Sequence, residues 1–536
     1  MEIRKLLVAN RGEIALRIFA TCERLGIATV AVSPPDDRGA LHTRRADETV
    51  DIAGYLDAQE HVRAARESGA DAIHPGYGFL AESPEFAATV RDADLLWVGP
   101  PPEVLRAAGD KLEAKRIAAE AGVPVVPEGD PAVIGFPLVV KAAAGGGGRG
   151  MRVVRAPEEL DEALAAARRE AKAAFGDDRV FFERYLERPR HVEVQLLAGA
   201  DGAVSSLGER DCSVQRRHQK ILEESPSPAV DAALRASLGE AAVAFARAVG
   251  YVGAGTAEFM LEDESFWFLE LNARIQVEHP VTELVTGIDL VEQQLAIASG
   301  RPASALGSTR DPEGHAVEAR LYAEDPLTFL PQAGRIERLH LPEDVRVDAG
   351  VEEGDEVPVA YDPLIAKLIA HGETRDKALD RLAEGLRETE VRGVTTNLPF
   401  LRWLVAHPEL RAGRATTAFL SDYPPLSRAP RVSGPWAGSW GRQRGSRPPL
   451  TVETTARATE AAGAEQSVVK APMPGVVVRV LATEGDRVEP RQPLVLLEAM
   501  KMETPLVSPY AAVVRRVLVS EGDRVAGGAV LVELEE

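Results

Sequence analysis

The chain has 536 residues and a formal net charge of −21 at pH 7, with 45% hydrophobic and 27% charged residues. This length predicts several domains, and the acidic balance argues against a general nucleic-acid-binding protein, which needs a basic surface for phosphates. The two cysteines cannot form a disulfide framework and no apolar run reaches about 18 residues, so we expect a cytoplasmic protein without a signal peptide or membrane span.

The first hundred residues alternate apolar strands with amphipathic helices. We predict strands at 5–9, 28–32, 72–74 and 95–98, and helices at 12–25, 58–68 and 83–92. This alternation is typical of a parallel sheet with helices on its faces. The loops contain no G-x-G-x-x-G motif, so the sequence does not indicate a dinucleotide site.

The next segments have mixed patterns. Between 136 and 280 a strand precedes a glycine run, a helix is predicted at 157–174, and several strands follow. The last two of these strands are separated by the sequence EDES and predict an antiparallel hairpin. Residues 315–420 predict a further mixed α+β segment.

Residues 424–467 have the composition of a linker, with six prolines, several glycines and no steady hydrophobic period. They include Trp436 and Trp440 in the sequence GPWAGSW. Free linkers rarely contain tryptophan, so a segment that docks on a surface and a chance occurrence both stay open.

The last seventy residues contain an internal repeat, because EGDRV at 484–488 recurs at 521–525, a shift of 37 positions. Two similar β-rich halves predict a small pseudo-symmetric barrel or sandwich, in which the join between the halves is a turn. That join, EAMKME, places Lys501 on an exposed hairpin between two of the chain's six methionines. Apolar side chains at an exposed tip favour a functional segment over an ordinary surface turn.

Lysine is scarce, at ten of the 62 basic residues. Because arginine is used so freely in its place, each remaining lysine is a candidate for a role that requires lysine, although some are expected to be incidental. Lys141 directly precedes the glycine run and Lys111 lies upstream in GDKLEAKR. Glycines let backbone N–H groups approach phosphate oxygens, so the run predicts a nucleotide site, with a plain flexible loop as the alternative. It lacks the ending of a P-loop.

The stretch 270–278 alternates polar with apolar residues and is predicted to be one strand, opposite a partner strand that carries Glu258. All of its polar side chains would then share one face. Two carboxylates and an amide oxygen suit Mg²⁺ shared with ATP phosphates, and an arginine beside a glutamine suits a small planar anion. A solvated strand face is the alternative. The polar residues are Glu270, Asn272, Arg274, Gln276 and Glu278.

Together these segments resemble biotin carboxylase over residues 3 to 422. The hairpin AMKM resembles the biotinyl domain of biotin-dependent carboxylases, whose lysine carries biotin through an amide bond; a lipoyl domain normally has Asp before the lysine. The whole chain is similar to the α subunit of an acyl-CoA carboxylase of the acetyl- or propionyl-CoA type. The motifs are VANRGEIALR, HPGYGFLAE, GDK, KAAAGGGGRGM, RHVEVQ, GERDCSVQRRHQK, ELNARIQVEHPVTE, AVEARLYAEDP and GVTTNLPFL.

The resemblance implies an α/β and α+β architecture that ends in a small all-β unit. The implied segments are a pre-ATP-grasp Rossmann-like domain at 1–109, an ATP-grasp domain with a lid at 110–308, a biotin carboxylase C-terminal domain at 309–423, the linker at 424–467, and a biotinyl/lipoyl-like flattened barrel at 468–536.

The resemblance also implies the site residues. ATP would bind to Lys111, Lys141, Gly146, Gly147, Gly148, Glu183, Leu186, His191, Gln215 and His218. Mg²⁺ or Mn²⁺ would bind to Glu258, Glu270 and Asn272. Bicarbonate would bind to Arg274, Gln276 and the Val277 backbone, beside Lys220, with Glu278 as the base. Arg320 would stabilise the enolate of biotin, Tyr77 would line the biotin pocket, and Lys501 would carry the biotin.

The implied reaction uses ATP to activate bicarbonate as carboxyphosphate, which carboxylates the tethered biotin. The implied partners are a carboxyltransferase β subunit that passes the carboxyl group to an acyl-CoA, a biotin protein ligase, and further copies of the chain; no nucleic acid or membrane is expected. Three alternatives stay open: a different carboxyltransferase, for methylcrotonyl-CoA or a 2-oxo acid; an ATP-grasp ligase that joins a carboxylate to an amine; and a non-catalytic biotin carrier.

The sequence departs from the family's pattern in two places. Only 29 residues separate Lys111 from Lys141, fewer than the family usually has, which bears on how the lid moves. The linker is also too short for the domain that many α subunits use to contact the carboxyltransferase, so GPWAGSW is a candidate contact.

Overall fold

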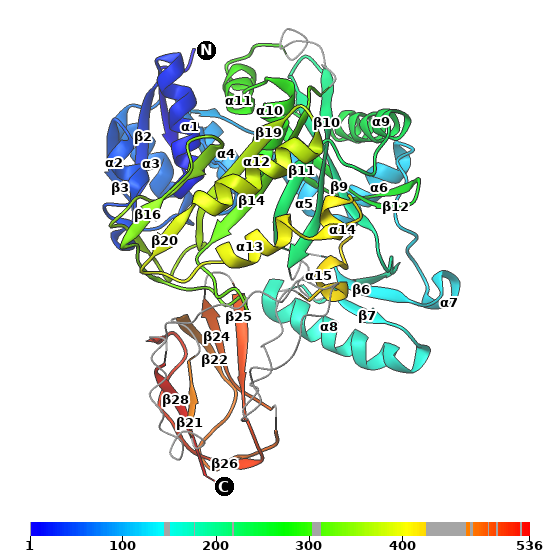
Figure 1. The fold of residues 1–536 in the computed structure, drawn as a ribbon, viewed down its shortest axis with the longest axis vertical. Coiled ribbons are helices and arrows are strands. Elements are labelled where there is room, and N and C mark those ends of the chain that lie inside the picture. The colour runs from blue at the N-terminus through cyan, green and yellow to red at the C-terminus, as the bar shows by residue number, and fades with distance from the viewer. Residues whose placement is uncertain are drawn as a thin grey trace, which may run out of the picture.

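The computed structural model describes residues 2–143, 151–175, 177–216, 219–302, 312–424, 468–471, 475–490, 492–499, 502–525 and 528–535. Figure 1 shows a large body formed by residues up to 424 and a smaller C-terminal β domain (468–535) beside it. In these ranges every helix is too short or too polar to cross a lipid bilayer.

The N-terminal domain contains a parallel sheet, as the alternating pattern predicts, with five strands in the order β3-β2-β1-β4-β5, of which β3 was not predicted. Helix α1 ends at Leu25 because Gly26 takes the left-handed conformation at φ 71° and caps the last turn. The strands are β1 (Lys5–Val8), β2 (Ala28–Ser33), β3 (Glu48–Asp51), β4 (Ala72–His74) and β5 (Leu96–Trp97). The helices are α1 (Gly12–Leu25), η1 (Pro35–Asp37), α2 (Leu41–Arg45), α3 (Ala58–Ser68), α4 (Pro84–Asp92) and α5 (Pro102–Gly109).

An eight-stranded antiparallel sheet forms the centre of the molecule, in the order β13-β12-β9-β10-β11-β14-β19-β17. It runs without a break from the segment before residue 302 into the segment after 312, so that strands of both segments belong to one sheet. The strands are β9 (Arg190–Ala198), β10 (Val204–Arg216), β11 (Gln219–Ser225), β12 (Gly253–Glu262), β13 (Ser265–Asn272), β14 (His315–Tyr322), β17 (Arg346–Ala349) and β19 (Leu364–Gly372).

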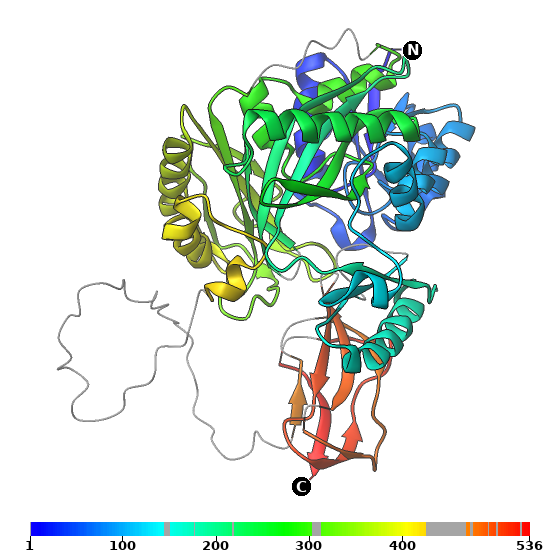
Figure 2. The ribbon, with the colours of Figure 1, turned by 90° about the vertical axis from the view of Figure 1, so that its right-hand side faces the viewer.

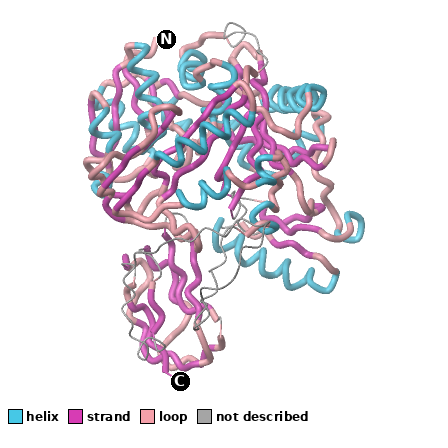
Figure 3. Tube along the Cα trace, in the orientation of Figure 1, coloured by secondary structure: helices cyan, strands magenta, loops and turns pink. Residues whose placement is uncertain are grey.

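Helices cover this sheet, and short strand pairs complete the body (Figure 3). The helices are α6 (Lys111–Glu120), α9 (Ala232–Val249), α10 (His279–Thr286), α11 (Leu290–Ala298), α12 (Arg375–Glu388), α13 (Leu398–Val405), α14 (Pro408–Arg411) and α15 (Phe419–Asp422). The pairs are β15 (Gly334–Arg335) with β18 (Glu356–Val357), and β16 (Arg338–His340) with β20 (Glu390–Arg392).

The segment with the glycine run, which was predicted to belong to a lid, contains a separate three-stranded sheet that projects from the body (Figure 2). It consists of β6 (Leu138–Ala142), β7 (Arg152–Val154) and β8 (Val180–Arg184), with helices α7 (Pro131–Ile134), η2 (Pro157–Glu159) and α8 (Leu160–Phe175). The glycine run falls between β6 and β7, and positions 144–150 lie outside the described residues.

The C-terminal β domain consists of two four-stranded sheets, in the orders β21-β28-β26-β23 and β25-β24-β22-β27. The predicted repeat is confirmed, because the N–H of Gly485 donates to Val514 O at 2.8 Å and the N–H of Gly522 donates to Val477 O at 2.7 Å, the same bond in each half. The strands are β21 (Val468–Lys470), β22 (Gly475–Val480), β23 (Arg487–Val488), β24 (Pro493–Ala499), β25 (Met502–Val507), β26 (Ala512–Val517), β27 (Arg524–Val525) and β28 (Val530–Glu535). The predicted linker beyond residue 424 and Lys501, between β24 and β25, lie outside the described residues.

Candidate active site

A cavity of about 530 Å³ opens between the N-terminal domain and the central sheet. Most of the side chains predicted to act together line it. They are Tyr77, Lys111, His191, Lys220, Glu258, Glu270, Asn272, Arg274, Gln276, Val277, Glu278 and Arg320.

Glu258 on β12 and Glu270 on β13 face each other across the antiparallel pair. Burial and the charge of Glu258 raise the pKa of Glu270 above its usual value. Asn272 lies two residues further along β13 and is 8% exposed. Two close carboxylates and an amide oxygen are a donor set suited to a hard divalent cation, whose charge would relieve their repulsion, so these residues fit Mg²⁺.

The predicted strand over 270–278 is wrong after Asn272, where β13 ends. There the chain turns toward the N-terminal domain, and the N–H of Ala273 donates to Glu82 Oε1 at 3.0 Å instead of to a neighbouring strand. The polar side chains still converge, because Arg274 donates to Glu82 Oε2 at 3.0 Å, to Gln276 Oε1 at 2.8 Å and to Asn272 Oδ1 at 3.0 Å.

The anion site predicted here has a free donor. Gln276 is 4% exposed, and its Nε2 has no hydrogen-bond partner among the described residues. A buried amide N–H₂ without an acceptor is costly, so it fits a site that accepts an anionic oxygen. Glu82, which orients Arg274, closes the motif HPGYGFLAE, and the sequence reasoning did not single it out.

The ammonium of Lys220 on β11 lies among three carboxylates from three other segments. Its Nζ donates to Glu193, to Glu258 Oε1 at 2.8 Å and to Glu278 Oε1 at 2.7 Å. Burial disfavours the charge of Lys220, but these carboxylates outweigh that effect and raise its pKa well above the usual value. Lys220 therefore stays protonated and supplies a fixed positive charge in the cavity.

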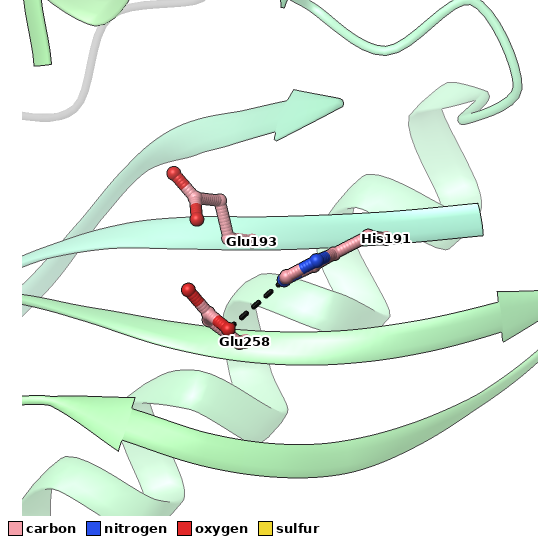
Figure 4. A group of neighbouring side chains, drawn as sticks. All are labelled: His191, Glu193 and Glu258. Carbon is pink, nitrogen blue, oxygen red and sulfur yellow. Dashed lines mark ion pairs between the residues drawn. The ribbon is translucent and has the colours of Figure 1, made fainter. Parts of the chain in front are cut away.

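His191 and Glu193 lie on β9 and point toward Glu258 on β12 (Figure 4). His191 Nε2 is 2.9 Å from Glu258 Oε2, and its Nδ1 is 2.5 Å from Gln215 Nε2. The ligand atoms of His191, Glu193 and Glu258 lie within 4.8 Å of one another, as a metal site would require. Lys220 places its ammonium on two of these carboxylates, those of Glu193 and Glu258.

Glu278 directly precedes helix α10 and is fully buried between two cations. Arg320 on β14 donates to its Oε2 at 2.9 Å, and Lys220 donates to its other oxygen. Burial opposes ionisation of Glu278, but the charges of Lys220 and Arg320 outweigh it and hold its pKa well below the usual value. The same nitrogen of Arg320, Nη2, also lies 2.5 Å from Glu223 Oε1.

Two lysines, one on α6 and one on β6, share one buried carboxylate. Lys115 and Lys141 both contact Glu183 on β8, which is 1% exposed. Lys111, at the start of α6, places its Nζ 3.7 Å from Glu270 Oε2 and so faces the predicted metal ligands. Lys115 lies in the same motif as Lys111, but the sequence reasoning assigned it no role.

Lys367 on β19 is a second buried lysine that the sequence reasoning left without a role. Its Nζ is 3.1 Å from Glu13 Oε2 and donates to Val277 O at 2.8 Å. Glu13 in turn accepts from the hydroxyl of Tyr77. Lys367 thus connects the backbone of the predicted anion site with the side chain predicted to line the biotin pocket.

The other predicted residues do not line this cavity or lie outside the described chain. Lys141, Glu183, Leu186 and Gln215 do not line the cavity. Gly146, Gly147, Gly148, His218 and Lys501 lie outside the described residues.

Four family descriptions match consecutive parts of the chain. Residues 2–105 match "Biotin carboxylase, N-terminal domain", 110–306 "Carbamoyl-phosphate synthase L chain, ATP binding domain", 318–422 "Biotin carboxylase C-terminal domain" and 467–534 "Biotin-requiring enzyme".

Individual proteins agree with these matches. The chain is 45% identical over 441 residues to a biotin carboxylase of Halalkalibacterium halodurans, covering 78% of this chain and 98% of that protein. It is 47% identical over 445 residues to the methylcrotonoyl-CoA carboxylase subunit alpha of Arabidopsis thaliana, covering 78% of this chain but 61% of that subunit.

A solved structure has the same fold. The biotin carboxylase domain dimer of Hydrogenobacter thermophilus 2-oxoglutarate carboxylase, in complex with MgADP, ADP and bicarbonate, superimposes with a TM-score of 0.77 at 41% identity. The match covers 79% of this chain and 98% of that one.

Proposed function

Because the chain belongs to the biotin carboxylase family, we propose that it uses ATP and bicarbonate to carboxylate biotin held on its own C-terminal β domain. ATP, Mg²⁺ and biotin are its substrate and cofactors, since an ATP-binding domain and a biotin-requiring domain stand on one chain. The observation that carries the proposal is the single cavity in which the acid pair Glu258 and Glu270, the cation Lys220 and the ion pair of Glu278 with Arg320 converge.

Phosphoryl transfer depends mainly on positioning and charge neutralisation. We assign Glu258, Glu270 and Asn272 to Mg²⁺, which when bound neutralises charge on the ATP phosphates. The proposed ATP contacts are Lys111, Lys141, Gly146, Gly147, Gly148, Glu183, Leu186, His191, Gln215 and His218.

Arg274, the unpaired amide of Gln276 and the backbone N–H of Val277 are proposed to hold bicarbonate beside Lys220. Glu278 remains ionised at neutral pH and is the proposed base that removes the proton of bicarbonate. Arg320 and Tyr77 are proposed to receive the ureido ring of biotin, where a cation that never loses its proton stabilises developing negative charge.

Lys501 is the proposed attachment point of biotin, with a biotin protein ligase as the modifying enzyme. We propose that a separate carboxyltransferase subunit then passes the carboxyl group to an acyl-CoA, either acetyl-CoA or propionyl-CoA, and that the chain associates with further copies of itself. Methylcrotonyl-CoA is the alternative acceptor, which the Arabidopsis relative supports by its name.

The test compares the purified chain with a Lys501→Arg variant. The chain should hydrolyse ATP in a bicarbonate-dependent reaction that free biotin stimulates, and Lys501→Arg should keep this activity but lose incorporation of labelled bicarbonate into protein. ATP hydrolysis that ignores both bicarbonate and biotin would refute the proposal. Incubating the holo chain with its co-purified partner and each acyl-CoA in turn identifies the acceptor.

A further inference from the structure

A closed loop over residues 324–332 directly follows β14, the strand that carries Arg320. The N–H of Gln332 donates to Ala323 O at 2.8 Å, and the N–H of Asp325 donates to Leu330 O at 2.9 Å. Glu324 and Pro331 form an isolated bridge between these bonds. The loop therefore has a fixed base at the end of the strand.

Side chains hold the interior of the 324–332 loop. Asp325 Oδ1 accepts from the N–H of Leu327 at 2.9 Å and of Thr328 at 2.7 Å. Phe329 turns inward, where its ring centroid lies 5.1 Å from that of Phe400 and 5.1 Å from the Arg216 guanidinium. In this arrangement Phe329 packs into the body, and the next side chain, Leu330, lies on the other side of the loop.

Leu330 packs against the hydrophobic core of the C-terminal β domain. In the described parts of the chain, it is the one hydrophobic side chain from outside that domain that packs on this core. Figures 1 and 2 both place the end of the domain where β24 and β25 meet next to the body. In the sequence, Lys501 stands between these two strands.

The 324–332 loop is also connected to the cavity. Glu324 accepts from Arg216, and Arg216 donates to Gln219 Oε1 at 2.6 Å. Gln219 and Tyr322, the last residue of β14, both line the cavity. A domain seated on Leu330 therefore lies at the margin of the site that we assign to biotin.

We propose that the 324–332 loop is the docking site of the chain's own C-terminal β domain while its biotin is carboxylated, with Leu330 as the apolar contact. This inference rests on the proposed function, because it supplies the position from which tethered biotin reaches the cavity. The contact is small, which suits a domain that must leave again to deliver the carboxyl group.

The test uses full-length, biotinylated protein with Leu330→Asp, and Leu327→Asp as the matched control. Leu327 belongs to the same loop but is 40% exposed. Leu330→Asp should slow single-turnover carboxylation of the chain's own biotin by about ten-fold or more, since it places a charge at a partly buried apolar contact. Free-biotin-stimulated ATP hydrolysis should stay within about two-fold of the parent, and Leu327→Asp should change neither rate.

Two results would overturn the inference. Leu330→Asp could carboxylate its own biotin at the parent rate, which would show that the contact is not used. It could instead lose free-biotin and tethered-biotin activity in equal proportion, which would show that the loop supports the cavity and is not a docking site. Failure of the proposed function itself is distinguishable, because the parent chain would then lack free-biotin activity.

Discussion

Replacing Lys367 by methionine tests how much one buried ammonium contributes to stability and to bicarbonate binding. The side chain is fully buried, and its Nζ lies 3.1 Å from Glu13 Oε2 and 3.6 Å from Asp348 Oδ2 and donates to Val277 O at 2.8 Å. Methionine has nearly the same length but leaves two buried carboxylates and a carbonyl without this cation.

Removing one partner of a buried ion pair costs about 3–5 kcal/mol, because the other charge stays buried and uncompensated. With an unfolding entropy of about 2.1 cal/mol/K per residue over a unit of roughly 420 residues, that cost lowers Tm by about 3–6 °C. The loss of the bond to Val277 O also frees the backbone of the proposed bicarbonate site, so KM for bicarbonate should rise.

The loss of stability in Lys367→Met should depend on pH. Burial already raises the pKa of Glu13, while the charge of Lys367 lowers it. Without Lys367, the native state holds a proton on this carboxyl more tightly than the unfolded state does, so stability falls as pH rises through the native pKa. The loss in Tm should therefore be larger near pH 8 than near pH 6.

Differential scanning calorimetry at both pH values and steady-state kinetics in bicarbonate measure these effects. Lys377→Met is the control, because Lys377 is 58% exposed and pairs only across one helical turn with Glu373; such pairs contribute less than about 1 kcal/mol. If Lys367→Met matched Lys377→Met in both Tm and KM for bicarbonate, the argument from the buried cation would be wrong.

Two further substitutions test separate parts of the site. Glu278→Gln should lower kcat for biotin carboxylation by about 100-fold or more while ATP still binds, because it removes the proposed base. The pKa of Glu278 is held low in the parent. The parent's activity should therefore not fall through protonation of Glu278 between about pH 6 and 9. A Glu278→Gln rate near that of the parent contradicts the assignment. Asn397→Asp removes the amide that donates to Arg320 O at 3.0 Å, although its oxygen can still accept from Tyr322 N at 2.9 Å. In this variant KM for free biotin should rise about ten-fold, while biotin-independent ATP hydrolysis is unchanged. An equal loss of both activities would indicate general destabilisation.

The sequence was sufficient for several of the regular elements of the fold. Helix α1 and helix α3 have the predicted bounds, because their apolar spacing is strong and a glycine follows each. The repeat predicted the two halves of the C-terminal β domain, since a fixed shift of 37 positions relates their strands. Strand β11 was not predicted, because nothing in its local pattern shows that it pairs with both β10 and β14.

The site was predicted where one stretch of sequence contains several ligands, and missed where a partner comes from elsewhere. The alternation of polar and apolar residues continues to Glu278, but strand pairing stops at Asn272. The chain turns there because the next backbone N–H bonds to Glu82 of the N-terminal domain. Glu193 was missed for a similar reason. His191, two residues earlier, was predicted to contact ATP, whereas Glu193 belongs to the site because it pairs with Lys220 on another strand.

At two positions in the site, geometry explains why lysine is kept in a chain that otherwise favours arginine. Lys220 contacts three carboxylates that converge from different directions, and Lys367 contacts two carboxylates and a carbonyl. An ammonium is a compact charge with three N–H donors, so it can sit at the centre of such a set, whereas the planar guanidinium spreads its donors along one edge. Arginine can replace lysine on a surface with little consequence, but at these two centres the substitution would leave at least one acceptor buried without a donor. Among the retained lysines, Lys220 and Lys367 therefore mark the two places in the site where several acceptors meet at one point.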